Sequence, residues 1–197
     1  MASTAVLVHG GFHGGWCWKK VRRILRDRGW TVFTPTLTGL GESAHLASAS
    51  VALETHIQDV LGVLEAEELR DVVLCGRSAG GMVITAVADR APERISHLIY
   101  LDAIVPRTAS RRLMWSPTNT TMTSCSPWLR KRAKAGLRRR FLDGHASSLD
   151  GRPGWRVDRW DSGHGVIITE PERVADLISS PRNPYPAKTV LMRLGSP

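Results

Sequence analysis

The first half of the chain alternates between short apolar runs and longer amphipathic stretches. Four of the runs are almost continuously apolar or β-branched, which is typical of strands buried on both faces of a parallel sheet. The runs cover residues 5–8, 31–34, 72–75 and 98–101. We therefore expect at least four parallel strands before residue 106.

The stretches between these runs have the spacing of helices. One apolar face recurs at i, i+3, i+4 and i+7 and consists of Ile57, Val60, Leu61 and Leu64. A second helix should extend from about Gly81 to Arg90 and end before Pro92, because the residue before a proline disfavours helical geometry. Strands alternating with helices predict an α/β domain, with helices on both faces of a mostly parallel sheet.

The alternation stops after Pro106. Residues 107–153 are rich in Ser, Thr, Pro and Arg without a clean period, although 128–142 could be helical. Order resumes over 154–179, with a short strand at 155–158 and a capping-box sequence, Thr169 to Glu172, ahead of a helix. The proline-rich stretch 180–197 is expected to be irregular. The predicted parts are a first piece of the core (1–106), an atypical Arg-rich cap or insert (107–153), a second piece (154–179) and a tail.

Composition changes this picture at one place. The chain has 197 residues and a net charge of +9, but residues 107–156 hold twelve Lys and Arg against two acids. The basic character therefore belongs to one segment. Its binding to nucleic acid or an anionic membrane is the lesser alternative, because Arg-rich stretches are more often solvated surface. We expect neither specific nucleic-acid binding nor membrane association.

The remaining composition fits a single cytoplasmic domain. No apolar run has the length of a membrane span, and the first residues lack the basic and apolar parts of a secretion signal. Cys17, Cys75 and Cys125 are scattered and match neither a disulfide framework nor a metal site. We expect no cofactor and no metal, and the sequence leaves the oligomeric state open.

The first motif with chemistry is Gly76-Arg77-Ser78-Ala79-Gly80-Gly81, directly after a predicted strand and before a predicted helix. A serine at such a turn has a strained backbone and an exposed hydroxyl, and the glycines provide room for the turn. The helix that follows directs its N-terminal amides toward developing negative charge. Ser78 is therefore the candidate nucleophile, and the amide of Ala79 is one candidate donor of an oxyanion hole.

A second glycine-rich motif, His9-Gly10-Gly11-Phe12-His13-Gly14-Gly15-Trp16, follows the first predicted strand. Its glycines allow one amide, that of Gly11, to supply the other oxyanion-hole donor. A phosphate-binding loop is disfavoured, because no Lys-Ser/Thr pair follows and the G-x-G-x-x-G spacing is absent. The two histidines lack acidic or Cys companions, so we expect them to be structural hydrogen-bonding groups.

The third motif is Asp161-Ser162-Gly163-His164-Gly165, between the late strand and the last helix. In a Ser, acid, His order, the base belongs on a loop at the carboxyl edge of the sheet. His164 is the histidine in that position. We expect His45, His56, His97 and His145 to be surface or packing residues.

These motifs, with Leu37–Ser43 and Tyr100–Pro106, resemble the α/β-hydrolase superfamily, in particular the plant methylesterase, hydroxynitrile lyase and bacterial EstC-like esterase group. The resemblance implies that Ser78 is the nucleophile and His164 the general base. The lyases of this group have a threonine where Gly10 stands and a lysine where Gly165 stands. Ester hydrolysis is therefore the favoured activity, and a lyase activity the less favoured one.

The chain departs from the group between 107 and 153. There the group has a helical cap and then a strand whose end supplies the catalytic aspartate, and neither is visible here. The cap and the acid-bearing strand are thus expected to be shortened or altered. Three candidate acids remain: Asp102 after the fourth predicted strand, Asp143 and Asp150. Some superfamily members similar to haloalkane dehalogenases take their acid from the position of Asp102.

Two functional hypotheses follow. The first is a carboxylic ester hydrolase that cleaves a small, largely apolar ester through an acyl-enzyme on Ser78. The second is a weakened or inactive hydrolase-fold protein that binds a small ligand in the former pocket, which a lost acid strand would favour.

Overall fold

A computed structural model of the protein describes residues 3–106, 155–180 and 189–194. Within these ranges, six strands form one parallel sheet in the order β2-β1-β3-β4-β6-β5. The strands are β1 (Thr4–Val8), β2 (Thr31–Phe33), β3 (Val72–Arg77), β4 (Ile95–Leu101), β5 (Trp155–Trp160) and β6 (Thr189–Leu194). The four strands that the apolar runs predict are present, and so is the short strand expected at 155–158.

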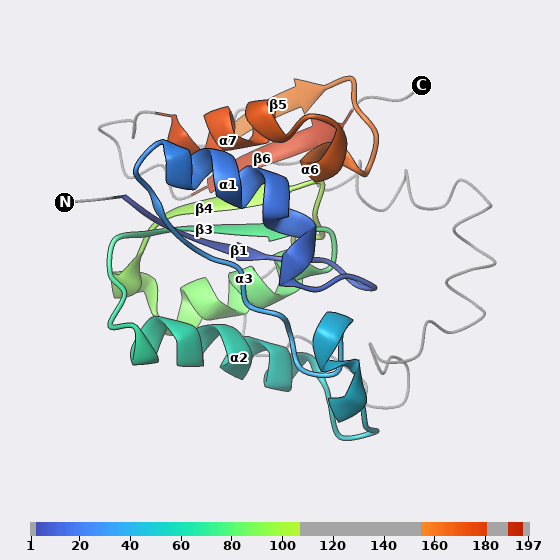
Figure 1. The fold of residues 1–197 in the computed structure, drawn as a ribbon. Helices are drawn as coiled ribbons and strands as arrows, with labels where there is room; N and C mark the ends of the chain where they lie inside the picture. The colour runs from blue at the N-terminus through green and yellow to red at the C-terminus, as the bar shows by residue number, and fades with distance from the viewer. Residues whose placement is uncertain (1–2, 107–154, 181–188, 195–197) are drawn as a thin grey trace.

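Helices cover both faces of the sheet, which confirms the predicted α/β class (Figure 1). One face carries α1 (Lys19–Asp27), α6 (Val166–Thr169) and α7 (Pro171–Ser179), and the other carries α2 (Leu53–Ala66) and α3 (Gly80–Arg90). Short 3-10 helices are formed by Gly15–Trp18, Gly41–Leu46 and Pro92–Arg94. None of the described helices combines the length and apolar content that a membrane-spanning segment needs.

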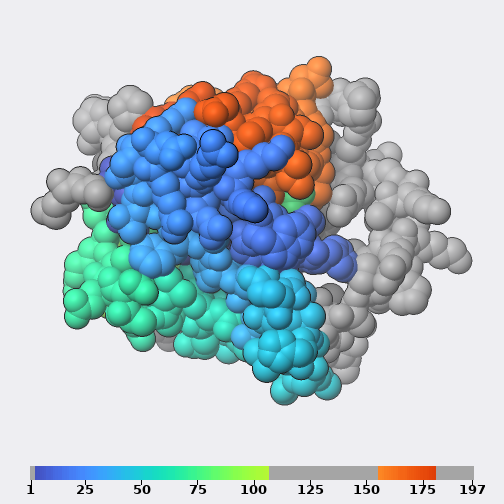
Figure 2. Space-filling view, in the orientation of Figure 1, coloured from blue at the N-terminus to red at the C-terminus, as the bar shows by residue number. Residues whose placement is uncertain are grey.

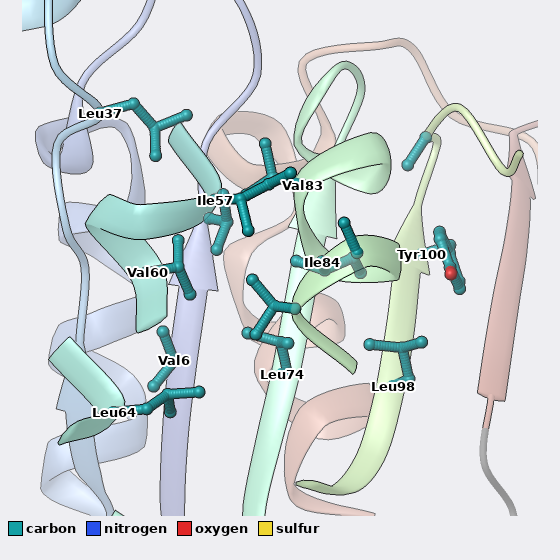
Figure 3. Close-up of a cluster of buried hydrophobic side chains, with 14 of the residues drawn as sticks. Val6, Leu37, Ile57, Val60, Leu64, Leu74, Val83, Ile84, Leu98 and Tyr100 are labelled. Atoms are coloured by element: carbon teal, nitrogen blue, oxygen red, sulfur yellow. The ribbon is translucent and has the colours of Figure 1, made fainter. Parts of the chain in front are cut away.

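Successive residues of the strands enter two separate apolar layers. In β1, Val6 and Val8 pack with α2 and α3, whereas Ala5 and Leu7 pack with α1 and α7. Figure 3 shows Val60 and Leu64 of α2 beside Val6. Because both faces of each central strand are buried, the strands read as continuous apolar runs.

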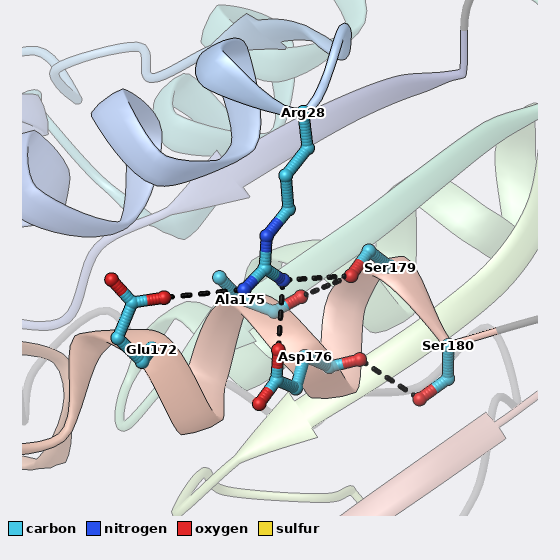
Figure 4. Close-up of polar contacts among 6 residues, drawn as sticks. All are labelled: Arg28, Glu172, Ala175, Asp176, Ser179 and Ser180. Atoms are coloured by element: carbon cyan, nitrogen blue, oxygen red, sulfur yellow. Dashed lines mark hydrogen bonds and ion pairs between the residues drawn. The ribbon is translucent and has the colours of Figure 1, made fainter.

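Polar contacts attach α7 to the end of α1 (Figure 4). The Arg28 guanidinium lies 2.8 Å from Asp176 and 3.2 Å from Glu172, and it donates a hydrogen bond to Ser179 (3.1 Å). In Figure 2, the segments of α1 and α7 adjoin on one face of the molecule. Two pieces of sequence far apart in the chain therefore form one side of the fold.

Three features differ from the sequence-based expectations: the stretch 180–197, helix α1 and the start of helix α7. The stretch 180–197, expected to be irregular, contains β6, which pairs in parallel with β4 and β5. Proline lacks the main-chain N–H that a strand donates to its neighbour, and the last proline before this strand is Pro186. The run Thr-Val-Leu-Met at 189–192 contains no proline, so it can form the ladder hydrogen bonds. The helix α1 was not predicted, because basic residues separate its apolar positions Val21, Ile24 and Leu25.

The predicted capping box is absent. Helix α7 begins at Pro171, its N-cap is Glu170, and the cap residue makes no side-chain capping hydrogen bond. Proline at the first helical position presets the backbone for a helix start, which fixes the boundary there. Thr169 is instead the last residue of α6.

Candidate active site

Ser78 occupies the turn between β3 and α3 in a left-handed conformation, with φ of 53°. Such a conformation is strained for a residue with a side chain and is tolerated only where the surroundings impose it. Here the surroundings are tight. A β-carbon at Gly76 would lie 2.8 Å from the main-chain oxygen of Gly80, and one at Gly80 would lie 2.7 Å from that of His9. The glycines are thus required by space, as predicted.

The loop after β1 lies against the Ser78 side chain. A β-carbon at Gly10 would be 2.8 Å from the Ser78 Cβ and 3.4 Å from its Oγ. The buried His9 side chain fixes this loop, since its Nδ1 donates to the Gly10 oxygen (2.7 Å) and its Nε2 accepts from the Leu37 amide (3.0 Å). Burial lowers the pKa of His9, which keeps the ring neutral as this pairing requires. The predicted structural role of His9 is confirmed.

Each of the two candidate oxyanion-hole residues is next in sequence to a residue of the serine site. Ala79 is the N-cap residue of α3, and Gly11 follows the glycine that touches Ser78. The Gly11 oxygen accepts a hydrogen bond from Nδ1 of His13 (2.9 Å), which turns that carbonyl toward the histidine. Stabilisation of an oxyanion by these two amides stays a prediction.

Asp102 lies directly after β4 and joins the two other candidates. Its carboxylate is hydrogen-bonded to Nδ1 of His164. The main-chain oxygen of Asp102 accepts a hydrogen bond from the Ser78 amide (3.2 Å), and the main-chain oxygen of Ser78 accepts one from the Ile104 amide (2.9 Å). Asp102 has φ of 45°, a left-handed geometry that Asp tolerates better than most residues. Main-chain hydrogen bonds therefore connect the turn that carries the Asp102 carboxylate to the turn that carries the Ser78 hydroxyl.

His164 lies on the loop between β5 and α6 and is held through both its ring and its backbone. The ring binds Asp102, and the main-chain oxygen accepts two hydrogen bonds from the guanidinium of Arg77. Since a carboxylate only accepts, Nδ1 carries the proton and Nε2 is left as the basic nitrogen of the neutral ring. This is the tautomer that a general base acting on a serine needs.

The structure brings together Ser78, His164 and Asp102 with the loop that carries Gly11. The other candidate acids, Asp143 and Asp150, lie outside the described residues. Sequence reasoning did not assign a role to Arg77. The feature of the sequence that points to Arg77 is a charged residue at the end of the otherwise apolar β3 strand, in which all six residues are buried.

Comparison with known proteins gives one family and several relatives. A family model described as "Alpha/beta hydrolase family" matches residues 5–162. A carbendazim hydrolyzing esterase of Nocardioides sp. (strain SG-4G) is 60% identical over 101 residues, which are 51% of this chain and 42% of that protein. Methylesterase 9 of Arabidopsis thaliana is 37% identical over 106 residues, which are 53% of this chain and 41% of that protein.

Among solved structures, polyneuridine aldehyde esterase is similar with a TM-score of 0.50 and 28% identity, over 54% of this chain and 42% of that one. The chain thus spans less than half the length of each of these relatives.

Proposed function

Since the chain belongs to the alpha/beta hydrolase family, we propose that it is a serine esterase that cleaves a small, largely apolar ester. The esterase names of its relatives support this class of reaction. The apolar preference is supported by two aromatic side chains, Phe12 beside Gly11 and Trp16 in the 3-10 helix that follows, which are each more than half exposed.

The proposed reaction has two stages. The Ser78 hydroxyl attacks the ester carbonyl while His164 Nε2 takes its proton, and the carbonyl oxygen becomes an anion bound by the Gly11 and Ala79 amides. The proton then passes from His164 to the leaving alkoxide, which departs as the alcohol. Water, deprotonated by His164, attacks the acyl-enzyme and releases the acid, returning the proton to Ser78.

One observation carries the proposal: Asp102 binds His164 through its side chain and Ser78 through its backbone. A carboxylate on Nδ1 stabilises the imidazolium that forms during attack. The strained backbone of Ser78 needs this support from β4 to keep its hydroxyl in place.

Hydrolysis of a short-chain p-nitrophenyl ester tests the proposal. We expect turnover in the native protein, its loss in Ser78→Ala and His164→Ala, and its retention in Ser96→Ala. Ser96 is a suitable control because it lies near the start of β4, at the opposite edge of the sheet, and donates to the Asp71 oxygen. Turnover that survives Ser78→Ala would refute the proposal.

The alternative of an inactive, ligand-binding protein gives a different outcome. Esters or their product acids would then raise the melting temperature without being consumed, and Ser78→Ala would leave that stabilisation intact.

A lyase activity is disfavoured by the space beside Ser78. The lyases of the resembling group have a threonine at the position of Gly10, and a β-carbon there would lie 2.8 Å from the Ser78 Cβ. The loop would have to shift before it could hold that side chain.

A further inference from the structure

We propose that Arg77, the residue before the proposed nucleophile, positions the proposed base His164 by binding the main-chain oxygen of His164. This inference rests on the proposed function for its kinetic consequence. It starts from an unusual burial: the Arg77 side chain lies at the end of β3, and the residue is only 4% exposed. Arginine does not lose its proton in proteins, so the site holds a buried positive charge.

Such a charge is costly unless its donors are satisfied. Part of that requirement is met by His164, whose main-chain oxygen accepts from Nε of Arg77 at 3.2 Å and from Nη2 at 2.5 Å. Two donors of one planar group on one acceptor restrain that carbonyl in direction as well as distance. The Arg77 charge also acts on Cys17. Burial raises the pKa of the Cys17 thiol to about 11, and the positive charge of Arg77 opposes that rise.

The contact matters because of where its two ends lie. The loop that carries His164 spans the step from β5 to α6, and its ring is anchored to Asp102. Arg77 binds the main-chain oxygen of His164, and Asp102 binds its ring. His164 is therefore held at both its backbone and its imidazole. The restraint comes from the residue bonded to Ser78, so the loop of the base is attached to the turn of the nucleophile. Small displacements of a catalytic group cost large factors in rate, about 100-fold for 1 Å.

The test compares Arg77→Met, Arg77→Lys and a matched control, Arg94→Met. Arg94 also donates to two main-chain oxygens, those of Leu64 and Leu69, but it belongs to the 3-10 helix before β4. We expect Arg77→Met to lower kcat for a p-nitrophenyl ester by about tenfold or more with little change in KM. Arg77→Lys, which retains the charge but not the planar pair of donors, should fall between Arg77→Met and the native protein.

Arg94→Met should lose thermal stability while its kcat stays native. A native kcat in Arg77→Met would overturn the proposal. A loss of kcat no larger than that in Arg94→Met at equal stability would do the same.

A readout without turnover separates this proposal from the esterase assignment. In ¹⁵N-histidine spectra assigned with His164→Ala, the Nδ1 signal of His164 should shift or broaden in Arg77→Met and stay native in Arg94→Met. If the native protein cleaves no ester, the proposed function fails, and these spectra still decide whether Arg77 positions His164. Unchanged His164 signals in a folded Arg77→Met protein would refute the positioning role.

Discussion

Asp102 and His164, 62 residues apart in sequence, are joined by a hydrogen bond between the Asp102 carboxylate and Nδ1 of the imidazole. The contact links the end of β4 to the loop after β5, although β6 lies between these strands in the sheet. The candidate acid thus belongs to the part of the fold that also holds the serine turn, and the histidine alone comes from the second described piece of the chain.

The role of Asp102 predicts a large effect from a small change. In Asp102→Asn the side chain keeps its size, but its amide group no longer imposes the Nδ1–H tautomer or stabilises the imidazolium. We expect kcat for a p-nitrophenyl ester to fall on the order of 10⁴-fold. Steady-state kinetics measure this, with circular dichroism to verify folding.

The other two candidate acids provide the control for that experiment. Asp143→Asn and Asp150→Asn should each leave kcat near the native value. A large loss in either variant, together with a mild loss in Asp102→Asn, would move the acid to that residue and contradict our assignment.

Two glycine substitutions should change stability in opposite directions. A β-carbon at Gly80 would lie 2.7 Å and 2.9 Å from two main-chain oxygens of β1 and its loop, whereas one at Gly62 in α2 would meet nothing within 4 Å. Gly80→Ala should therefore destabilise the protein by about 1–3 kcal/mol. Gly62→Ala should stabilise it by about 0.5–1 kcal/mol, because alanine favours a helix interior. Urea denaturation distinguishes the two, and equal effects would contradict the crowding that we describe.

The contacts of Arg28 predict a modest stabilisation between α1 and α7 (Figure 4). Arg28→Ala should lower the free energy of unfolding by about 1 kcal/mol, because the pairs with Asp176 and Glu172 are partly solvated. The control is Arg23→Ala, whose partner Asp27 lies 3.9 Å away on an exposed surface, and it should cost less. In a double-mutant cycle, Arg28 and Asp176 should couple, and additive effects would show that the pair contributes nothing.

The ion pair of Glu54 and Arg90 should make stability depend on acid pH. Hydrogen bonds from Arg90 and Gln58 lower the pKa of Glu54 to about 2 from its usual value of 4.5. Above pH 4.5 the carboxylate is charged in both folded and unfolded chains, and its contribution is complete. As the pH falls from 4.5 to 2, the unfolded chain takes up the proton first, so this contribution is lost.

Glu54→Gln should accordingly lower the melting temperature at pH 7 and have little effect near pH 2. Because the pair is exposed, its contribution at pH 7 should be about 1 kcal/mol or less. Glu65→Gln, on the same helix, is the control for the loss of one carboxylate from α2. A deficit in Glu54→Gln that persists unchanged to pH 2 would contradict the assignment of the shift to this carboxyl.

Much of the fold could be predicted because burial leaves a local mark on the sequence. The continuous apolar character of 72–75 follows from helices on both sides of β3. Helix α1 was missed because its polar face consists almost entirely of Lys and Arg, some of which bond to distant groups: Arg22 to Thr34, and Lys20 to the Ile168 oxygen. Those partners are fixed by tertiary structure, which a local window does not contain.

The candidate site likewise has one part that the local sequence predicts and another that only the tertiary structure identifies. Ser78 could be predicted from its neighbours, since the strained turn requires glycines within two residues on each side. The acid could only be narrowed to three aspartates, because its identity depends on which carboxylate reaches His164 in space. The bond between Arg77 and the His164 oxygen likewise joins a side chain to a backbone atom 87 residues away, and no sequence pattern encodes it.

The position of β6 has a consequence for how the protein forms during synthesis. Among the described strands, β5 shares ladder hydrogen bonds with β6 alone, and β6 in turn pairs with β4. The ribosome makes β5 and the His164 loop before it makes residues 189–194. The strand preceding His164, the candidate base, therefore cannot join the sheet until a later segment has been made. The turn that carries Ser78, the candidate nucleophile, is synthesised well before that point.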